Sequence, residues 1–250
     1  MRAFRATAWV ELKLLVREPL TVMFVLVLPV VVLYVLNGVF GADPADPAVW
    51  EGESAIDFYT SAYVALVAAT AGVLSLPVQL AGYREKGVLR RFRASSMPGA
   101  VLIGAHMCVA VVVAAAGALL VTVTALVGYD AQPPRSWPGV VVAFLVAAVA
   151  FAALGSLLGL LLPTARAAQG LGVLLFFVFM MVGGSGPPVE ALPEGLQRAS
   201  ELLPATYAAA LVRAPWLHAS WDWAATVVLT VMLVGSLSLA AWRLAREELG

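Results

Sequence analysis

A basic segment between two long apolar stretches carries the most distinctive chemistry in this 250-residue chain. Within ten residues it places five bases and one acid, namely Arg84, Glu85, Lys86, Arg90, Arg91 and Arg93. If the segment is helical, Val88, Leu89 and Phe92 share one small apolar face. A short amphipathic helix of this kind can dock into a groove of another protein. Anchoring to an anionic membrane surface is the alternative, and it explains the sign of the charge but not the apolar residues.

One serine lies in a pattern that some membrane enzymes use. Residues 183–186, Gly-Gly-Ser-Gly, match the G-x-S-G of rhomboid intramembrane proteases, which also have six spans. A serine nucleophile needs a histidine within hydrogen-bonding reach, which rhomboids place in the last span. Here His218 precedes the last apolar stretch and His106 lies in the third. We therefore interpret the glycines as a helix end, keep a protease as the weakest alternative, and expect neither catalytic residues nor a metal site.

The sequence lacks the motifs by which a transporter draws on an energy source of its own. Its two lysines, Lys13 and Lys86, do not lie in G-x-x-x-x-G-K-[ST], the loop that holds ATP phosphates. The apolar stretches contain no carboxylate, which a gradient-coupled carrier usually keeps at membrane depth. Asn37, Gln79 and His106 are polar groups at that depth and form a candidate substrate path, although His106 could instead be a buried structural imidazole. Uphill transport would therefore need energy from a partner.

Six long uncharged stretches must position these groups. The chain is 62% hydrophobic and 12% charged, whereas soluble domains have about 45–50% apolar and about 25% charged residues. A helix needs about 20 apolar residues to cross the hydrocarbon core. The sequence predicts spans near residues 21–40, 59–82, 101–128, 138–162, 167–184 and 222–242. We therefore expect an all-α integral membrane protein that forms a single transmembrane domain over residues 1–250.

The basic residues fall almost entirely on one side of the predicted spans. Twelve of the 15 Lys and Arg residues lie in the N-terminal segment, the second and fourth loops and the C-terminal segment. Arg135, Arg198 and Arg213 lie on the other side, where the first loop has five acids and no base. Because basic loops stay in the cytoplasm, both termini are predicted to be cytoplasmic.

The N-terminal segment is expected to form a helix in the membrane interface. Lys13 and Arg17 share one face of such a helix, Glu11 lies roughly opposite, and apolar residues lie between them. Pro19 would end the helix just before the first span. This arrangement is typical of an amphipathic helix that lies on the membrane surface.

The loop between the fifth and sixth spans is too long to be a simple connector. Pro193 is expected to open a helix with Leu196 on its apolar face, and Pro204 is expected to end that helix. Residues 206–213, which begin with Thr206 and Tyr207, are expected to form a second short helix. Both helices would lie at the outer membrane surface, as a lid or a dimer contact.

Several motifs along the chain, in this order, are similar to those of one transporter family. They are Glu11-Leu12-Lys13-x-x-x-Arg17-x-Pro19, Arg84-Glu85-Lys86-Gly87-x-Leu89-Arg90-Arg91-x-Arg93-Ala94, Gly183-Gly184-x-Gly186-x-Pro188 and Leu203-Pro204-Ala205-Thr206-Tyr207. The chain resembles the permease of ABC-2 type transporters, the drug- and polysaccharide-exporter branch of ABC systems. The resemblance covers nearly the whole chain, and the second and fourth motifs are its most specific parts.

The resemblance implies a half-transporter of six helices that pairs with a second permease copy, as a homodimer or heterodimer. Each copy would sit on a separate cytoplasmic ATPase subunit, which would bind ATP and magnesium, while this chain would bind no cofactor and would not itself be an enzyme. The loop after the second span would be the coupling helix, formed by Arg84, Glu85, Lys86, Gly87, Leu89, Arg90, Arg91 and Phe92. The N-terminal helix, with Glu11, Lys13 and Arg17, would add to the ATPase contact. The two short helices, with Pro193, Leu196, Pro204, Thr206 and Tyr207, would cap the outer side.

The remaining expectations concern cargo and location. Short outer loops favour small-molecule over polymer export, and the scarcity of polar residues in the spans favours a lipophilic or amphiphilic cargo, as in drug or antibiotic efflux. A passive channel or a secondary carrier is the alternative. The formal net charge of +0 gives no indication of nucleic-acid binding. We expect a multi-pass protein of the bacterial cytoplasmic membrane, in contact with lipid.

Overall fold

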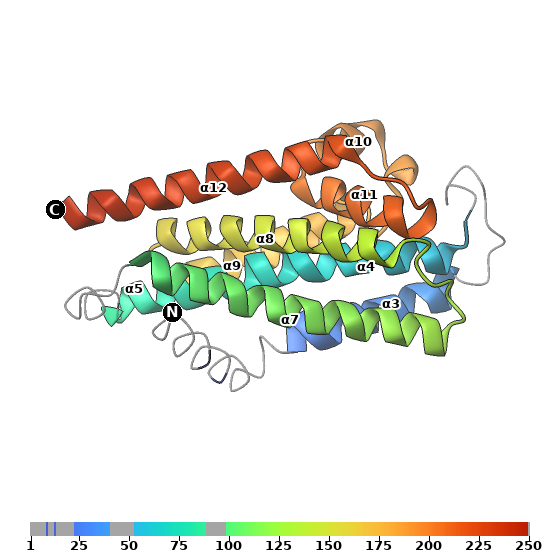
Figure 1. Ribbon diagram of the computed structural model, residues 1–250, viewed down its shortest axis with the longest axis horizontal. Helices are drawn as coiled ribbons and strands as arrows, with labels where there is room; N and C mark the ends of the chain where they lie inside the picture. Colours follow the sequence, from blue (N-terminus) through green and yellow to red (C-terminus); the bar gives the residue numbers. More distant parts are fainter. Residues whose placement is uncertain (1–8, 10–12, 14–22, 41–52, 89–98, 250) are drawn as a thin grey trace.

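The computed structural model describes residues 23–40, 53–88 and 99–249, together with Trp9 and Lys13. All regular elements in these ranges are helical. In chain order they are η1 (Met23–Val27), α3 (Leu28–Phe40), α4 (Ala55–Thr70), η2 (Ala71–Ser75), α5 (Leu76–Glu85), α7 (Gly99–Gly128), α8 (Trp137–Leu161), α9 (Ala165–Val182), η3 (Val189–Ala191), α10 (Glu194–Ser200), α11 (Pro204–Leu217) and α12 (Trp223–Leu249). The long helices run side by side along the length of the molecule, and α10 and α11 lie at one end (Figure 1).

Five helical stretches among the described residues are long and apolar enough to cross a membrane. They are Ala55–Glu85, Val101–Gly128, Trp137–Leu161, Ala165–Val182 and Trp223–Arg246, and they coincide with the second to sixth predicted spans. The first predicted span, 21–40, coincides with η1 and α3 over residues 23–40. The all-helical fold class is thus confirmed, and the described residues contain five of the six expected crossing helices by length and composition.

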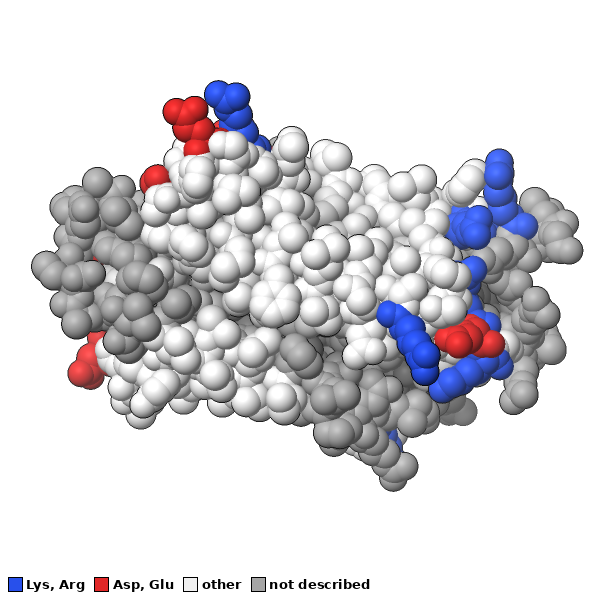
Figure 2. Space-filling model, turned by 180° about the vertical axis from the view of Figure 1, so that it is seen from behind, with Lys and Arg blue, Asp and Glu red and all other residues white. Residues whose placement is uncertain are grey.

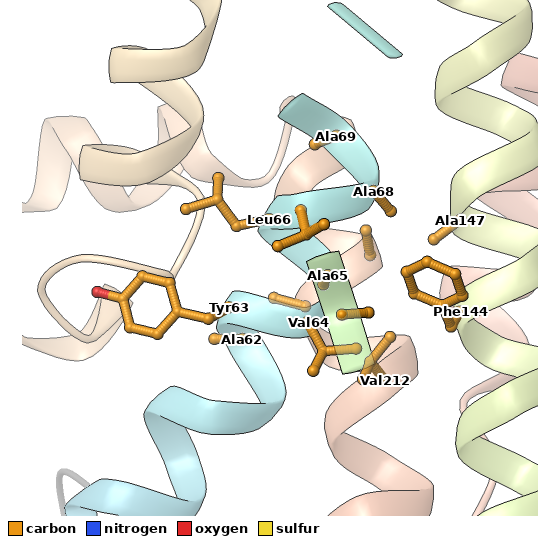
Figure 3. Close-up of a cluster of buried hydrophobic side chains, with 14 of the residues drawn as sticks. Ala62, Tyr63, Val64, Ala65, Leu66, Ala68, Ala69, Phe144, Ala147 and Val212 are labelled. Carbon is orange, nitrogen blue, oxygen red and sulfur yellow. The ribbon is translucent and has the colours of Figure 1, made fainter. Parts of the chain in front are cut away.

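Helix α4 lies at the centre of the packing. Nearly all of its side chains are buried, and it packs against α7, α8 and α11. Figure 3 shows residues 62–66, 68 and 69 of α4 in the buried cluster that also contains Phe144 and Ala147 of α8 and Val212 of α11. Many of these side chains are alanine and valine, which allow helices to approach closely where lipid removes the hydrophobic driving force for association.

The second span contains a π-helical segment, η2, between α4 and α5. A Cβ atom added to Gly155 of α8 would overlap the carbonyl oxygen of Gly72 in this segment. A Cβ added to Gly172 of α9 would lie 2.6 Å from the carbonyl oxygen of Val73. Gly155 and Gly159 form the G-x-x-x-G pattern of the fourth span, and both pack against the second span of the same chain. The pattern therefore serves packing within the subunit.

One face of the bundle is apolar between two charged ends. Figure 2 shows a broad band without charged residues, with Lys and Arg gathered mainly at one end. Helices α9 and α12 bury the smallest shares of their apolar windows. Their outward-facing side chains include Leu174 and Phe177 of α9 and Val231 and Leu239 of α12, which are exposed. This distribution fits contact with lipid or with a second membrane subunit.

Candidate functional site

The end of α5 leads directly into the predicted coupling helix. Helix α5 ends at Glu85, where the amide of Lys86 donates to the carbonyl oxygen of Gly82 at 3.0 Å. Gly87 follows with φ +67°, a left-handed conformation that glycine adopts without steric cost. Lys86 is exposed. Leu89, Arg90, Arg91 and Phe92 lie outside the described residues, so a helix that contains them remains a prediction.

Two side chains at this end bind the turn between α8 and α9. Nη1 of Arg84 donates to the carbonyl oxygens of Leu160 and Leu162, the second at 3.1 Å. The amide of Ala165 donates to Oε2 of Glu85 at 3.1 Å. We call this set of five residues the inner clamp. The resemblance assigns Arg84 and Glu85 to the coupling helix. In the structure both side chains bond to the chain's own turn, with Arg84 half-buried and Glu85 exposed.

Helix polarity explains the pairing in the inner clamp. The last carbonyls of α8 and the first amides of α9 lack partners within their own helices. They carry partial negative and partial positive charge, respectively, so a guanidinium suits the first group and a carboxylate the second. Thr164 caps α9 as well, because its Oγ1 accepts from the amide of Ala167 at 3.2 Å. Arg84 and Glu85 thus complete the caps of two helices that lie more than 70 residues away in sequence.

The short helices before α12 differ in detail from their predicted form. Pro193 precedes α10 as its N-cap residue rather than forming its first turn, and α10 ends at Ser200 rather than near Pro204. Pro204 instead begins α11, which runs to Leu217 and so exceeds the predicted 206–213. Proline suits a first helical position because its missing N–H needs no partner there. Leu196 of α10 is 42% exposed, so its apolar side chain is accessible at the surface of this chain.

Thr206 and Tyr207 hold the corner between α10 and α11. Oγ1 of Thr206 donates to the carbonyl oxygen of Ser200 at 2.7 Å, and the Tyr207 hydroxyl donates to the carbonyl oxygen of Glu201 at 2.7 Å. The two carbonyls belong to the last residue of α10 and to its C-cap residue, and that of Ser200 also accepts from the amide of Leu203 at 3.0 Å. Thr206 and Tyr207, two of the five residues predicted to cap the outer side, therefore have a structural role at this corner.

Helix α11 is also fixed to α4 and to the segment after α9. The Arg213 guanidinium lies over the Phe58 ring, 3.6 Å from its centroid, and Nη2 of Arg213 is 3.5 Å from the carbonyl oxygen of Gly184. The Ser185 hydroxyl is buried and donates to the carbonyl oxygen of Ala62 at 3.3 Å. The serine of the protease-like pattern thus makes a packing contact with α4.

The polar residues at membrane depth bond within their own helices. His106 is 1% exposed, its Nδ1 lies 2.9 Å from the carbonyl oxygen of Leu102, and its ring packs edge-on against Tyr83. Nε2 of Gln79 donates to Oγ of Ser75 at 3.3 Å. Asn37 belongs to α3, but its side chain lies outside the described residues. The burial of His106 favours the structural interpretation over the substrate path.

The predicted N-terminal helix is described at two positions. Trp9 and Lys13 are helical, and Nζ of Lys13 lies 5.1 Å from the centroid of the Trp9 ring. The four-residue spacing places the two side chains on the same face of a helix. Glu11 and Arg17 lie outside the described residues.

The N-terminal ends of α4 and α8 meet the C-terminal end of α11 in a network of hydrogen bonds. Oδ1 of the buried Asp57 accepts from the amide of Gln132 at 2.6 Å, and Oγ of Ser54 donates to its Oδ2 at 2.6 Å. The amides of Arg135 and Ser136 donate to the last carbonyls of α11, those of Trp216 and Pro215, at 3.0 and 3.1 Å. The loop between α7 and α8 therefore connects the beginning of α4 with the end of α11.

Comparisons with known proteins agree with this architecture. The family model of the ABC-2 type transporter matches residues 2–217. A protein of Bacillus subtilis (strain 168) named "Putative transport permease YvfS" is 24% identical over 208 residues, which cover 82% of this chain and 81% of that protein. The matched region contains the inner clamp, the short helices α10 and α11 and all crossing helices except α12. This multi-pass membrane chain belongs to the ABC-2 type transporter family.

Proposed function

We propose that this chain is the membrane-spanning permease subunit of an ATP-binding cassette exporter. The match to the transporter family over residues 2–217 carries the proposal. The sequence also has no lysine in an ATP-binding loop, so a separate ATPase subunit would supply the energy. The chain itself would bind no cofactor. A second permease copy, identical or related, would complete the translocation path.

The proposed topology has six spans with both termini in the cytoplasm of a bacterial plasma membrane. Its support is the distribution of charge among the described residues. Five bases, Arg84, Lys86, Arg166, Arg243 and Arg246, and three acids, Glu85, Glu247 and Glu248, belong to the helix ends on the side of the inner clamp. Figure 2 shows Lys and Arg gathered mainly at one end of the molecule. The opposite end has three bases, Arg135, Arg198 and Arg213, and seven acids, Glu53, Asp57, Asp130, Glu190, Glu194, Glu201 and Asp222. Because basic residues are retained on the cytoplasmic side, the inner clamp would be cytoplasmic and α10 and α11 would face outward.

Energy would enter through residues 88–98, which we call the docking segment. Its bases and its apolar Leu89 and Phe92 suit an amphipathic helix in a groove of the ATPase. The N-terminal helix would add to that contact. Nucleotide-driven closure of the ATPase pair would move the docking segments, and the two permease copies would alternate between inward-open and outward-open forms. The helices α10 and α11 would close the outer side of the path.

The proposed cargo is a lipophilic or amphiphilic small molecule, as in drug efflux. The described spans consist mainly of alanine, valine and leucine, and the half-buried Gln79 and the buried His106 bond within their own helices. Such walls offer dispersion contacts rather than hydrogen bonds. Stimulation of ATP hydrolysis by a panel of lipophilic cations, with sugars of similar size as a comparison, would test the cargo class.

Assembly with an ATPase is the first test of this function. The permease would be co-expressed with a candidate ATP-binding cassette protein and purified through a tag on the permease. We expect the ATPase to copurify and to hydrolyse ATP in lipid nanodiscs. Transport by the permease alone in proteoliposomes would instead show a carrier or a channel and would reject the proposal.

Replacing Leu89 and Phe92 together by aspartate should abolish copurification of the ATPase. Two carboxylates would remove the apolar face of the docking segment and would remain unpaired in the groove of the partner. The amount of ATPase retained per permease on gel filtration measures the effect. Leu202→Asp is the matched control, because Leu202 is 85% exposed at the opposite end of the molecule. Equal retention by the double variant and the control would exclude the docking segment from the ATPase contact.

A further inference from the structure

The inner clamp joins three helix ends that the sequence separates. Arg84 binds the last carbonyls of α8, and Glu85 binds the first amide of α9. Only residues 162–164 lie between α8 and α9, so the turn has little chain in which to absorb a displacement. Movement at the end of α5 must therefore act on both helices as long as the clamp holds.

Close packing reinforces the clamp along α5. A Cβ added to Gly159 of α8 would lie 2.7 Å from Cβ of Leu80, so these two helices are already in contact. A Cβ added to Gly82 would lie 3.7 Å from Cβ of Ala165, at the beginning of α9. Interiors packed this closely transmit displacement instead of absorbing it. The end of α5 thus has both polar and steric connections to the α8–α9 turn.

We propose that Arg84 and Glu85 are positioning residues that transmit movement of the docking segment to α8 and α9. The inference rests on the proposed function, because a partner ATPase must move the docking segment. The docking segment begins three residues after Glu85 and leads into α7 at Gly99, so force applied to it acts on the end of α5, with Arg84 and Glu85, as well as on α7. The end of α5 and the α8–α9 turn then move as one body through the transport cycle. Arg84 and Glu85 act inside the permease, on its own turn, and not on the surface of the ATPase.

A disulfide can replace the clamp and so distinguish transmission within the permease from contact with the ATPase. The 3.7 Å spacing between positions 82 and 165 falls within the Cβ–Cβ range of about 3.5–4.5 Å that disulfides require. Gly82→Cys with Ala165→Cys would therefore link α5 to α9 without Arg84 or Glu85. The native Cys108 is first replaced by alanine. A bond within the permease can restore transmission through the chain but cannot restore a lost contact with the ATPase.

The experiment follows α9 in the complex of permease and ATPase in lipid nanodiscs. The reporter is bimane on Leu174→Cys, because Leu174 is 59% exposed on α9. We expect the emission maximum to shift when the ATPase is trapped with ADP and vanadate. Arg84→Gln and Glu85→Gln should each lose the shift, whereas Arg166→Gln, which removes an exposed base outside the clamp, should keep it. The oxidised disulfide should restore the shift in Arg84→Gln, and dithiothreitol should remove it again.

Three results would overturn the inference. The first is a wild-type complex in which trapping leaves the bimane emission unchanged. The second is an Arg84→Gln complex that the oxidised disulfide does not restore. The third is an oxidised disulfide that abolishes the shift in an otherwise native permease, since α5 and α9 would then have to separate. Failure of the ATPase to copurify at all would reject the proposed function instead, so the two failures are distinguishable.

Discussion

Gly155→Ala is expected to lower the stability of the folded permease more than the same substitution at any other glycine of α8. The new Cβ would overlap the carbonyl oxygen of Gly72, and a backbone atom cannot rotate away as a side chain can. Overpacking of a core costs about 1–3 kcal/mol where side chains can adjust. Here α8 must move away from η2, which would also disturb the neighbouring contact of Gly172 with Val73.

The matched control is Gly235→Ala in α12, where an added Cβ has no other heavy atom within 4 Å. Alanine in an unobstructed helical position is favoured over glycine by about 1 kcal/mol, so this variant should be as stable as the native chain or slightly more stable. The measurement is the temperature at which the monodisperse peak in gel filtration is halved, for protein in nanodiscs. Equal midpoints for the two variants would mean that α8 and η2 can separate at no cost.

The sequence predicted the spans well because hydrocarbon thickness constrains their length and composition. Predicted spans 101–128 and 138–162 agree with α7 and α8 to within two residues. The second span was predicted over 59–82, whereas its helical stretch covers Ala55–Glu85. Asp57 and Arg84 led the prediction to stop short, because an unpaired charge is costly near the membrane. In the fold both side chains have hydrogen-bond partners from distant parts of the chain.

The contacts that define the candidate site could not be predicted from local patterns. The inner clamp joins residues separated by more than 70 positions, and no periodicity relates Arg84 to Leu162. The π-helical segment η2 is equally hidden, because its residues have the composition of an ordinary apolar helix. The corner of α10 and α11 depends on Thr206 and Tyr207 reaching carbonyls six residues back. Motif resemblance identified these residues but not what they bind.

Asp57→Ala should destabilise the end of the bundle that holds Asp57 by about 1–3 kcal/mol, the cost of leaving buried hydrogen-bonding groups unsatisfied. Asp57 is 3% exposed, and the variant leaves the amide of Gln132 and the hydroxyl of Ser54 without their acceptor. The loop between α7 and α8 would then lose one of its attachments to α4. A lower midpoint in the same gel-filtration assay, together with faster proteolysis of this loop, is the expected result.

Glu53→Gln removes a carboxylate four residues away and provides the comparison. Glu53 forms an ion pair with Arg135 at 2.7 Å, in which the Arg135 side chain is 57% exposed. Exposed ion pairs contribute about 0–1 kcal/mol because water and salt screen them. We therefore expect Glu53→Gln to leave the thermal midpoint nearly unchanged. Asp57→Asn keeps an acceptor for the Gln132 amide, so its midpoint should lie between those of Asp57→Ala and Glu53→Gln. A larger fall in the midpoint for Glu53→Gln than for Asp57→Ala would contradict this account. The ion pair, and not the buried hydrogen bonds, would then stabilise the end of the bundle that holds Asp57.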